Sequence, residues 1–413
     1  MKRIPVKRHL TPIIVGTLAT ALLAACGGAG ASSNADTVRV GLLEPLSGPF
    51  ADNGKQARLG AELCTDQINK AGGIKSLGGA KIELVTKDTG AAAAAQVANQ
   101  LQSMVGQGNL SAVIGAWASS YTLAASTVAE QAKVPMVTES FADAITARNY
   151  QYIFKIPASA KLMGSEAVDR VLELAKASNY KITTAAVVAD NTSAATVSAN
   201  AAADRLKSLG VKVPVKESFT PGLTEGTSLA IKVLASKPQI IFLQGALSDM
   251  ALLQKAFKEQ GYKGPLLGAG SGFVATDYAK TVGDVANGTF SSAGWNWDMP
   301  GVEAKNFAEA FTAKNPQFPF PGQEAGEDCA AVYIIAAALE KAKSSKPEDV
   351  KNALSTIEIT SGPATMLASG KVSFDKTGML KDTTPVIVQW QDGKPYTVAP
   401  TKIATKKPIP FSQ

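Results

Sequence analysis

The sequence predicts an α/β protein of two lobes, each built on a doubly wound parallel sheet. Short apolar runs alternate with amphipathic helical patterns along most of the chain. These runs are apolar throughout, as expected for parallel strands that helices cover on both faces. The pattern begins near residue 38 and starts again near residue 158. Two similar α/β units therefore follow one another in the chain.

The first unit combines four strand patterns with three helical ones. Strands are expected over residues 38–45, 81–88, 111–117 and 135–140, and helices over residues 54–73, 91–108 and 119–133. The loop after the first strand, SGPFADNGKQ, is similar to a phosphate-binding loop. However, it has five residues between its glycines, and Gln56 stands where that loop needs a magnesium-binding Ser or Thr. We therefore expect this loop to bind something other than a nucleotide.

The second unit repeats this order of elements. Strands are expected over residues 182–190, 211–219, 239–245 and 264–271, and helices over residues 166–177, 196–210, 226–236 and 247–261. A strand pattern at 288–295, helices at 304–315 and 326–343, and a hairpin-like tail at 372–393 come later. These late elements must pack on lobes that are already formed, so the chain is expected to cross between lobes more than once. The predicted division is 38–157 with 291–378 for lobe 1, and 158–290 with 379–413 for lobe 2.

The amino terminus has the features of a lipoprotein signal. Four Lys and Arg residues precede an apolar stretch at 13–23 that is too short to span a bilayer. The stretch leads into LAAC, the form of a bacterial lipobox, in which Cys26 accepts diacylglycerol. We predict a signal peptide over residues 1–25, a lipid anchor at Cys26 and a flexible tether over residues 26–37. The folded body is then expected outside the cytoplasm, anchored to the cell membrane.

Composition argues against several classes of function. The formal net charge of +7 falls to +3 without the four signal cations, because residues 1–25 hold no Asp or Glu, and this is too little to predict a nucleic-acid partner. The one histidine, His9, lies in the signal, so Ser-His and Cys-His pairs and most zinc sites are excluded. We expect no enzyme, no cofactor and no metal site. Cys64 and Cys329 can pair, but the sequence does not decide between a disulfide and free thiols.

Four segments carry a family resemblance. They are VRVGLLEPLSGPFADNGKQARLGAELCTDQINKAGGI, AVIGAWASSYTLAASTVAEQAKVPMVTES, SLGVKV…SF…SLAIKVLASKPQIIFL and GKVSFDKTGMLKD…VIVQWQDG. Together they resemble the type I periplasmic binding proteins that serve branched-chain amino acid ABC transporters. The likeness extends from about Val38 to Val398. It implies two Rossmann-like lobes, joined by three hinge strands, that close on a small ligand.

The resemblance also implies a function and partners. It predicts an extracytoplasmic solute-binding lipoprotein, expected to be a monomer, that hands its ligand to the permease subunits of an ABC importer. The expected ligand is a branched-chain or other hydrophobic amino acid.

The position of the binding site follows from the strand order. Ligands of open α/β sheets bind at the carboxyl ends of the strands, and two facing lobes enclose a solute between such ends. The loops at these ends are 46–53, 116–121, 138–143, 190–196, 245–249 and 268–272. Helices that begin there offer unpaired N–H groups, which can hold a carboxylate without an arginine.

Several residues of lobe 1 are expected to bind the ligand. In the family, a serine and backbone N–H groups hold the ligand carboxylate at positions that match Ser119, Ser140 and Ala142. The same loops place further residues at the expected pocket: Asn53, Trp117, Ser120 and Tyr121. Two alternatives remain open at this point. The serines can act only as helix caps, and the aromatic residues, Trp295 among them, can serve lobe packing.

Lobe 2 departs from the family pattern. Members that bind amino acids often have a tyrosine, aromatic residues and a glutamate for the ligand ammonium where this chain has Ala194, Ala246 with Leu247, and Gly270. An amino-acid ligand then needs another anion, and the candidates are Glu139, Glu324, Glu327 and Asp328. A carboxylate or amide without an ammonium, such as an aromatic acid, is the alternative ligand. A ligand-sensing subunit of a signalling system is the alternative function.

Overall fold

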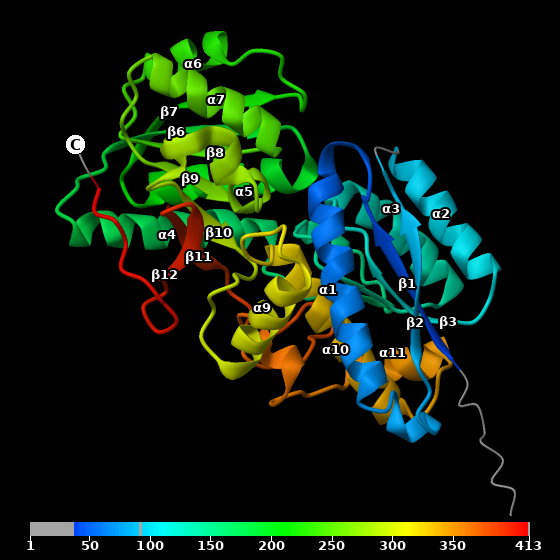
Figure 1. The fold of residues 1–413 in the computed structure, drawn as a ribbon. Coiled ribbons are helices and arrows are strands. Elements are labelled where there is room, and N and C mark those ends of the chain that lie inside the picture. Colours follow the sequence, from blue (N-terminus) through cyan, green and yellow to red (C-terminus); the bar gives the residue numbers. More distant parts are fainter. Residues whose placement is uncertain (1–36, 91–92, 412–413) are drawn as a thin grey trace, which may run out of the picture. The chain divides into compact units, whose positions relative to one another are not determined.

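Two β-sheets, one parallel and one parallel except at one edge, form the body of the protein, with helices on both faces (Figure 1). The computed structural model describes residues 37–90 and 93–411, and the larger unit of the chain comprises residues 35–413. The predicted signal peptide, Cys26 and nearly all of the predicted tether lie outside the described residues. None of the helices in the described ranges has the length and apolar character needed to cross a membrane. The predicted fold class is confirmed.

The first sheet has five parallel strands in the order β2-β1-β3-β4-β5. They are β1 Val38–Glu44, β2 Ile82–Asp88, β3 Leu110–Gly115, β4 Met136–Thr138 and β5 Ile153–Lys155. The helices between them are α1 Ala51–Lys70, α2 Ala94–Gly106 and α3 Ser119–Ala132. Side chains of β1 point alternately to the two faces. Leu42 therefore packs in the same cluster as α1, whereas Leu43 packs with α2 and α3.

Three later helices belong to this first lobe. They are α9 Val302–Lys314, α10 Gln323–Ala342 and α11 Pro347–Ser355. Helix α10 runs beside α1 (Figure 1) and is buried over most of its length. A side chain at Gly60 would collide with the carbonyl of Ala325, so this glycine permits the close approach of the two helices. A disulfide between Cys64 and Cys329 joins them, with a Cα–Cα distance of 5.3 Å, which settles the pairing that the sequence left open.

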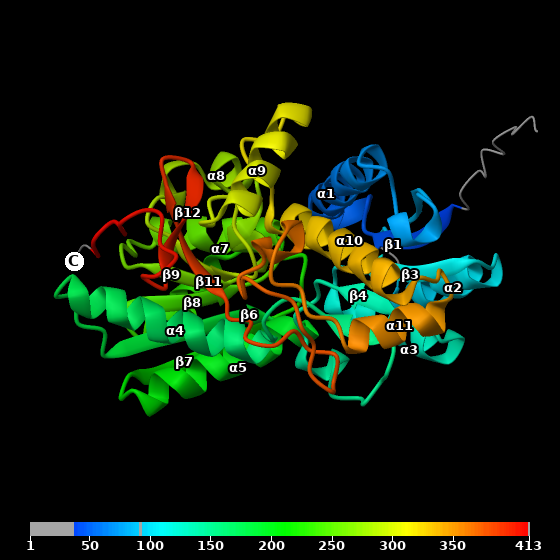
Figure 2. The same cartoon turned by 90° about the horizontal axis from the view of Figure 1, so that it is seen from below.

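The second sheet has seven strands in the order β12-β11-β10-β9-β8-β6-β7. They are β6 Thr184–Asp190, β7 Lys212–Phe219, β8 Ile240–Gln244, β9 Leu266–Ala269, β10 Phe290–Ala293, β11 Val386–Gln391 and β12 Lys394–Ala399. Helices α4 Ala160–Ala177 and α5 Ser193–Ser208 cover one face (Figure 2). Helices α6 Thr227–Leu234, α7 Leu247–Glu259 and α8 Tyr278–Val282 cover the other.

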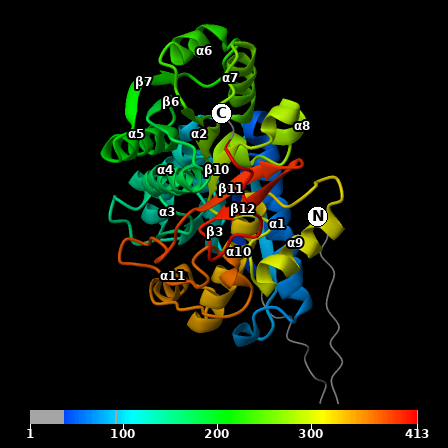
Figure 3. The ribbon, with the colours of Figure 1, turned by 90° about the vertical axis from the view of Figure 1, so that its left-hand side faces the viewer.

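Strands β11 and β12 add an antiparallel edge to this sheet. Strand β11 pairs with β10 and β12 pairs with β11 (Figure 3), although α9, α10 and α11 lie between β10 and β11 in the sequence. Their two-residue turn is Asp392-Gly393, with φ angles of 52° and 79°. Two successive positive φ values are typical of a hairpin turn of type I′, for which an Asp-Gly pair is favoured. The earlier part of the predicted tail forms only isolated bridges, including Phe374 with Leu380.

The chain passes between the two sheets three times. It crosses after β5, after β10 and again before β11. The first and third crossings lie side by side, because Lys155 pairs with Met379 and the amide of Lys155 donates to the carbonyl of Gly378 at 2.8 Å. Strand β10 continues to Ala293 within the second sheet. The division into two lobes that move as separate bodies stays a prediction.

Six short 3-10 helices complete the described elements. They span Gly48–Phe50, Lys75–Leu77, Asp143–Ile145, Ser271–Val274, Gly283–Ala286 and Pro363–Met366. The first leads directly into α1, so the SGPF turn of the sequence ends with Phe50 at the start of that helix. The fourth follows β9 at the carboxyl end of the second sheet. Both therefore lie where the sequence analysis places ligand-binding loops.

Candidate ligand-binding cavity

A cavity of about 150 Å³ lies where the carboxyl ends of the two sheets face each other. The first lobe contributes residues that follow β1, β3 and β4, and it adds the first turns of α10: Phe50, Asp52, Asn53, Trp117, Ala118, Ser119, Ser120, Glu139, Phe141, Gln323, Glu324 and Glu327. The second lobe contributes residues that follow β6, β8 and β9: Asp190, Thr192, Ser193, Ala194, Gly245, Ala246, Leu247, Gly272, Ala275 and Asp277. The cavity thus lies at the position expected for an open α/β sheet.

Four helices begin at the wall of this cavity. Helices α3, α5, α7 and α10 have first residues Ser119, Ser193, Leu247 and Gln323, and each of these lines it. The N–H groups of a first helical turn have no partner within the helix and carry partial positive charge. For α3, no side-chain cap occupies them. The wall therefore offers hydrogen-bond donors to a carboxylate or another negative group, although it contains no arginine or lysine.

Glu324 is held at the cavity wall by two donors from different elements. The side-chain amide of Asn53, on α1, donates to its Oε1 at 2.8 Å, and the indole of Trp117 donates to the same oxygen at 3.2 Å. The Trp117 ring in turn contacts Phe50, with ring centroids 4.9 Å apart. These contacts fix one carboxylate beside an aromatic surface. Such a surface suits the apolar part of a small ligand.

Six carboxylates line the cavity, and none of its described lining residues is basic. Four of them are buried: Glu139 and Glu324 are each 3% exposed, Glu327 is 1% exposed, and Asp190 of the second lobe is 6% exposed. Burial raises the pKa of Glu139 to about 7, raises that of Glu324, and takes that of Glu327 well above its usual range. Charged carboxylates are costly to bury without a counter-charge. A positively charged group is the chemical complement that this wall lacks.

Six of the ten sequence-predicted site residues line the cavity. They are Asn53, Trp117, Ser119, Ser120, Ala194 and Leu247. The other four are Tyr121, Ser140, Ala142 and Gly270, which the lining does not include. Three of these four, Ser140, Ala142 and Gly270, lie next to residues of the wall without lining the cavity. The binding role of all ten residues stays a prediction.

Ser140 and Ala142 hold wall residues in place. The hydroxyl of Ser140 donates to the carbonyl of Trp117 at 2.7 Å, and Trp117 has a positive φ of 50°, an uncommon conformation for a bulky residue. The amide of Ala142 donates to the hydroxyl of Ser119 at 3.2 Å. Tyr121 lies on α3 and packs in the core cluster that α2 and α3 share, and its hydroxyl lies 3.4 Å from the carbonyl of Gly90.

Gly270 adopts a backbone conformation that suits glycine, with φ of 69° and ψ of −148°. Its amide donates to the carbonyl of Ser292 at 2.7 Å, and a Cβ at this position would lie 3.4 Å from the ring of Phe141. The position therefore serves the turn after β9 and contacts the wall through Phe141. Trp295 also lies outside the lining. It is fully buried, packs on Phe307, and donates to the carbonyl of Met366 at 3.1 Å.

Several wall residues were not predicted from the sequence. Phe50 and Phe141 supply aromatic surface, and Gln323 accepts a 2.8 Å hydrogen bond from the amide of Gly294. Phe50 and Phe141 lie in or beside loops that the analysis placed at the site, so the signal was their position at the end of a strand. Gln323 gives no such signal, because the sequence does not reveal that α10 begins at the cavity.

Comparisons with known proteins agree on one family. Residues 37–394 match the model of the periplasmic binding protein family. A relative in Brucella melitensis, Leu/Ile/Val-binding protein homolog 8, is 28% identical over 90% of this chain and 92% of its own.

Two solved structures share the fold. The branched-chain amino acid transporter substrate binding protein LivJ from Streptococcus pneumoniae, in complex with isoleucine, has a TM-score of 0.75 at 24% identity and covers 87% of this chain and 98% of its own. A solute binding protein of an ABC transporter from R. palustris, in complex with benzoate, has a TM-score of 0.74 at 18% identity, with coverage of 91% and 97%. Because the family model matches most of the length of this chain, the chain belongs to the periplasmic binding protein family.

Proposed function

We propose that this protein is the extracytoplasmic solute-binding component of an ABC importer and that its ligand is an amino acid with an apolar side chain, of the branched-chain class. The observation that carries this proposal is the charge of the cavity wall. Two buried carboxylates of α10, Glu324 and Glu327, face a cavity with no basic lining residue among those described. A ligand that brings an ammonium supplies the missing counter-charge.

Each part of an α-amino acid has a matching part of the wall. The ammonium pairs with Glu324 and Glu327 on α10. The carboxylate accepts hydrogen bonds from the first turn of α3 at Ser119 and Ser120. The apolar side chain lies against Phe50, Trp117, and Leu247 of the second lobe. The negative charge for the ammonium thus comes from lobe 1, which compensates for the absence of a glutamate at Gly270.

The relatives support the ligand class without deciding it. Leucine, isoleucine and valine appear in the name of the Brucella relative, and isoleucine is bound in the Streptococcus structure. Benzoate is bound in another structure with the same fold. An aromatic acid brings a carboxylate and no positive charge, so in this cavity it would add to the negative charge of the wall. The buried carboxylates therefore favour an amino acid over an aromatic acid.

Calorimetric titration with leucine and with benzoate tests this choice. The parent protein is expected to bind leucine. In Glu324→Gln, the amide oxygen still accepts the bonds from Asn53 and Trp117, but the charge is gone. Leucine affinity should then fall about 10- to 100-fold, or ~1.5–3 kcal/mol.

The control for this experiment is Glu309→Gln, which removes an exposed carboxylate from α9 and should bind leucine like the parent. Binding of benzoate but not leucine by the parent would contradict the proposed ligand class. Unchanged leucine affinity in Glu324→Gln would contradict the proposed ammonium site.

We also propose that Cys26 anchors the mature chain to the membrane. The tether after Cys26 would then hold the ligand-binding body within reach of the permease. The LAAC sequence supports the anchor. When the protein is expressed in a bacterium, the parent should partition into the detergent phase, and Cys26→Ser should remain in the aqueous phase. Equal partition of the two proteins would contradict the lipid anchor.

A further inference from the structure

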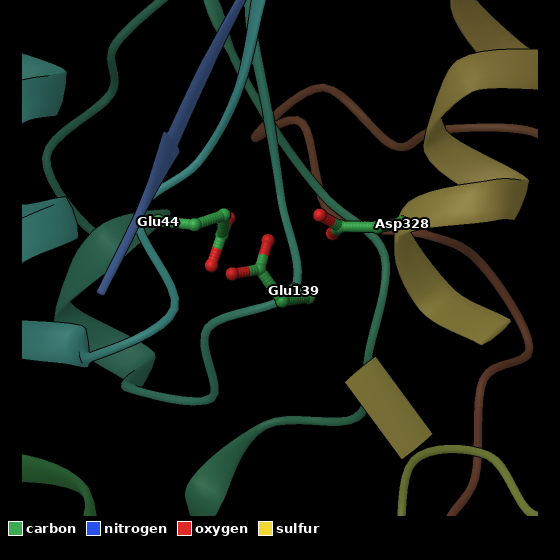
Figure 4. A group of neighbouring side chains, drawn as sticks. All are labelled: Glu44, Glu139 and Asp328. Atoms are coloured by element: carbon green, nitrogen blue, oxygen red, sulfur yellow. The ribbon is translucent and has the colours of Figure 1, made fainter. Parts of the chain in front are cut away.

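Three buried carboxylates meet behind the cavity wall, and they come from three separate elements. Glu44 ends β1, Glu139 follows β4, and Asp328 lies on α10. Figure 4 shows the carboxylates of Glu44 and Glu139 facing each other, with that of Asp328 directed toward them from the helix. One oxygen from each residue can be chosen so that all three lie within 4.8 Å of one another.

These carboxylates have no partner that would explain their burial. Glu44 and Asp328 are 0% exposed and Glu139 is 3% exposed, yet no described residue donates a hydrogen bond of normal distance and angle to any of their six oxygens. The backbone amides of Glu139 and Trp117 approach the Glu139 carboxylate and act to lower its pKa, but burial outweighs them and raises that pKa to about 7. No ion pair of the described residues includes them either. Buried polar groups normally have partners, and unpaired buried charges are especially costly. The arrangement therefore requires a positively charged species at this position.

Protons shared between the carboxylates are a weaker explanation for their burial than a bound cation. One proton shared between Glu139 and Asp328 would satisfy only a single pair of oxygens, and pairing all six would take three protons, each placed between two of the residues. Neighbouring Glu327 adds two more buried oxygens that lack a partner. A cation at the centre can contact oxygens of all three residues at the same time, and it also removes the repulsion between them.

We propose that Glu44, Glu139 and Asp328 bind a divalent cation with oxygen ligands, and that calcium fits best. Calcium takes six to eight oxygen ligands at about 2.3–2.6 Å, in flexible geometry and with monodentate or bidentate carboxylates. Magnesium demands near-ideal octahedral geometry and usually keeps several waters. Three buried carboxylates with six free oxygens meet the first set of requirements better than the second.

This cation would connect three structural elements beneath the ligand. It would tie the end of β1 and the segment after β4 to α10, which carries Glu324 and Glu327. Glu139 also lines the cavity, so the proposed site adjoins the cavity wall. The cation site is separate from the pair of glutamates proposed for the ligand ammonium. Its presence or absence can therefore be tested without any ligand.

The test uses the full protein after exhaustive dialysis against a calcium chelator. Calcium, magnesium and manganese are then added one at a time, and bound metal is measured by elemental mass spectrometry together with the midpoint of thermal unfolding. The parent is expected to retain one calcium ion per chain and to unfold at a higher temperature with calcium than without it. Glu44→Gln and Asp328→Asn should lose both properties, because each removes one charged ligand with little change in shape.

Glu62→Gln is the matched control, since it removes a partly exposed carboxylate from α1 and should behave like the parent. Retention of one magnesium or manganese ion, lost in both variants, would also support the site. The proposal is overturned if the parent retains no divalent cation and shows no shift in its midpoint, which would leave shared protons as the explanation. Binding that persists in both variants would overturn it as well, because the ion would then lie elsewhere.

Discussion

The indole Nε1 of Trp117 donates a 3.2 Å hydrogen bond to the Glu324 oxygen that also accepts from Asn53. Three segments far apart in the sequence thus converge on one buried carboxylate: the loop after β3, the first turn of α1 and the first turn of α10. The bond keeps the carboxylate directed at the cavity, beside the ring that contacts Phe50. Trp117 therefore positions Glu324 in addition to lining the wall.

Trp117→Phe should weaken the binding of leucine about 10-fold. The phenyl ring can still contact Phe50, but the donor is lost, and a hydrogen bond to a charged group contributes roughly 1.5 kcal/mol or more. Calorimetric titration measures the change. Trp297→Phe is the control, because Trp297 donates to the carbonyl of Pro395 and does not line the cavity. Equal losses in the two variants would show that the effect is not specific to Glu324.

The Cys64–Cys329 disulfide should stabilise the fold, since it closes a long loop and joins α1 to α10. The double variant Cys64→Ser/Cys329→Ser should lose about 2–5 kcal/mol of unfolding free energy. Denaturant titration measures the loss, and the denatured parent without reductant should show no free thiol from these two residues. A reactive thiol at either position would contradict the pairing, and equal stability of the two proteins would contradict its contribution.

Much of the fold could be predicted because its strands are short and buried on both faces. Leu42 and Leu43 illustrate this, since neighbouring residues of β1 pack against helices on opposite faces and both must be apolar. The approximate place of the site could be predicted for a similar reason, because parallel strands direct their following loops to one edge of the sheet. The resemblance to a known family added the expectation that three strands join the two lobes.

The rest depends on contacts that the sequence does not encode locally. Tyr121 lies only two residues after Ser119, but the rotation of about 100° per residue in an α-helix turns its side chain into the core. In the sequence, Glu44 is a polar residue at the end of a strand, and nothing near it indicates that Asp328 lies close to it in the fold. The expectation of no metal site rested on the absence of histidines after the signal peptide, and this absence carries no information about carboxylates that only the packing of α10 brings together.

Lys155 should make the stability of the fold depend on alkaline pH. Burial lowers the pKa of this lysine from 10.5 to about 8, and nearby Asp143 only partly opposes the effect. Between these two values the unfolded chain keeps the proton and the folded chain does not, so the contribution of this group to stability rises as the pH increases from about 8 to about 10.5. Below pH 8 the full cost of burying the charge is present.

The comparison with Lys155→Met isolates this contribution from other groups. The amine of Lys155 donates to the carbonyls of Phe141 and Ala142, and both carbonyls keep a backbone donor without it. Denaturant titrations of both proteins should therefore show the parent gaining stability relative to the variant as the pH is raised from 8 to 10. A constant difference across this range would contradict the lowered pKa.

The two lobes should close on the ligand, because the cavity wall is divided between them and only three crossings connect them. A ligand that contacts both lobes favours the closed state by its difference in affinity for the two states. Small-angle scattering should then give a smaller radius of gyration with saturating leucine than without it. An unchanged radius at saturation would count against closure.

Ser119→Ala tests the carboxylate end of the ligand. The hydroxyl of Ser119 lines the cavity at the start of α3 and accepts a 3.2 Å hydrogen bond from the amide of Ala142. Its loss removes one donor for a ligand carboxylate and one acceptor for that amide, so leucine affinity should fall by ~1–3 kcal/mol. The control Ser165→Ala removes an exposed hydroxyl that bonds only within α4, and it should bind leucine like the parent.

A second ligand separates the two roles of Ser119. Leucinamide keeps the ammonium and the apolar side chain but lacks the carboxylate. If Ser119 acts on the carboxylate, Ser119→Ala should lower the affinity for leucine by a larger factor than the affinity for leucinamide. If Ser119 serves only to hold Ala142, the substitution should lower both affinities by the same factor. Competition titrations with the two ligands measure the ratio, and equal factors would remove Ser119 from the carboxylate site and leave the backbone N–H groups of α3 as its donors.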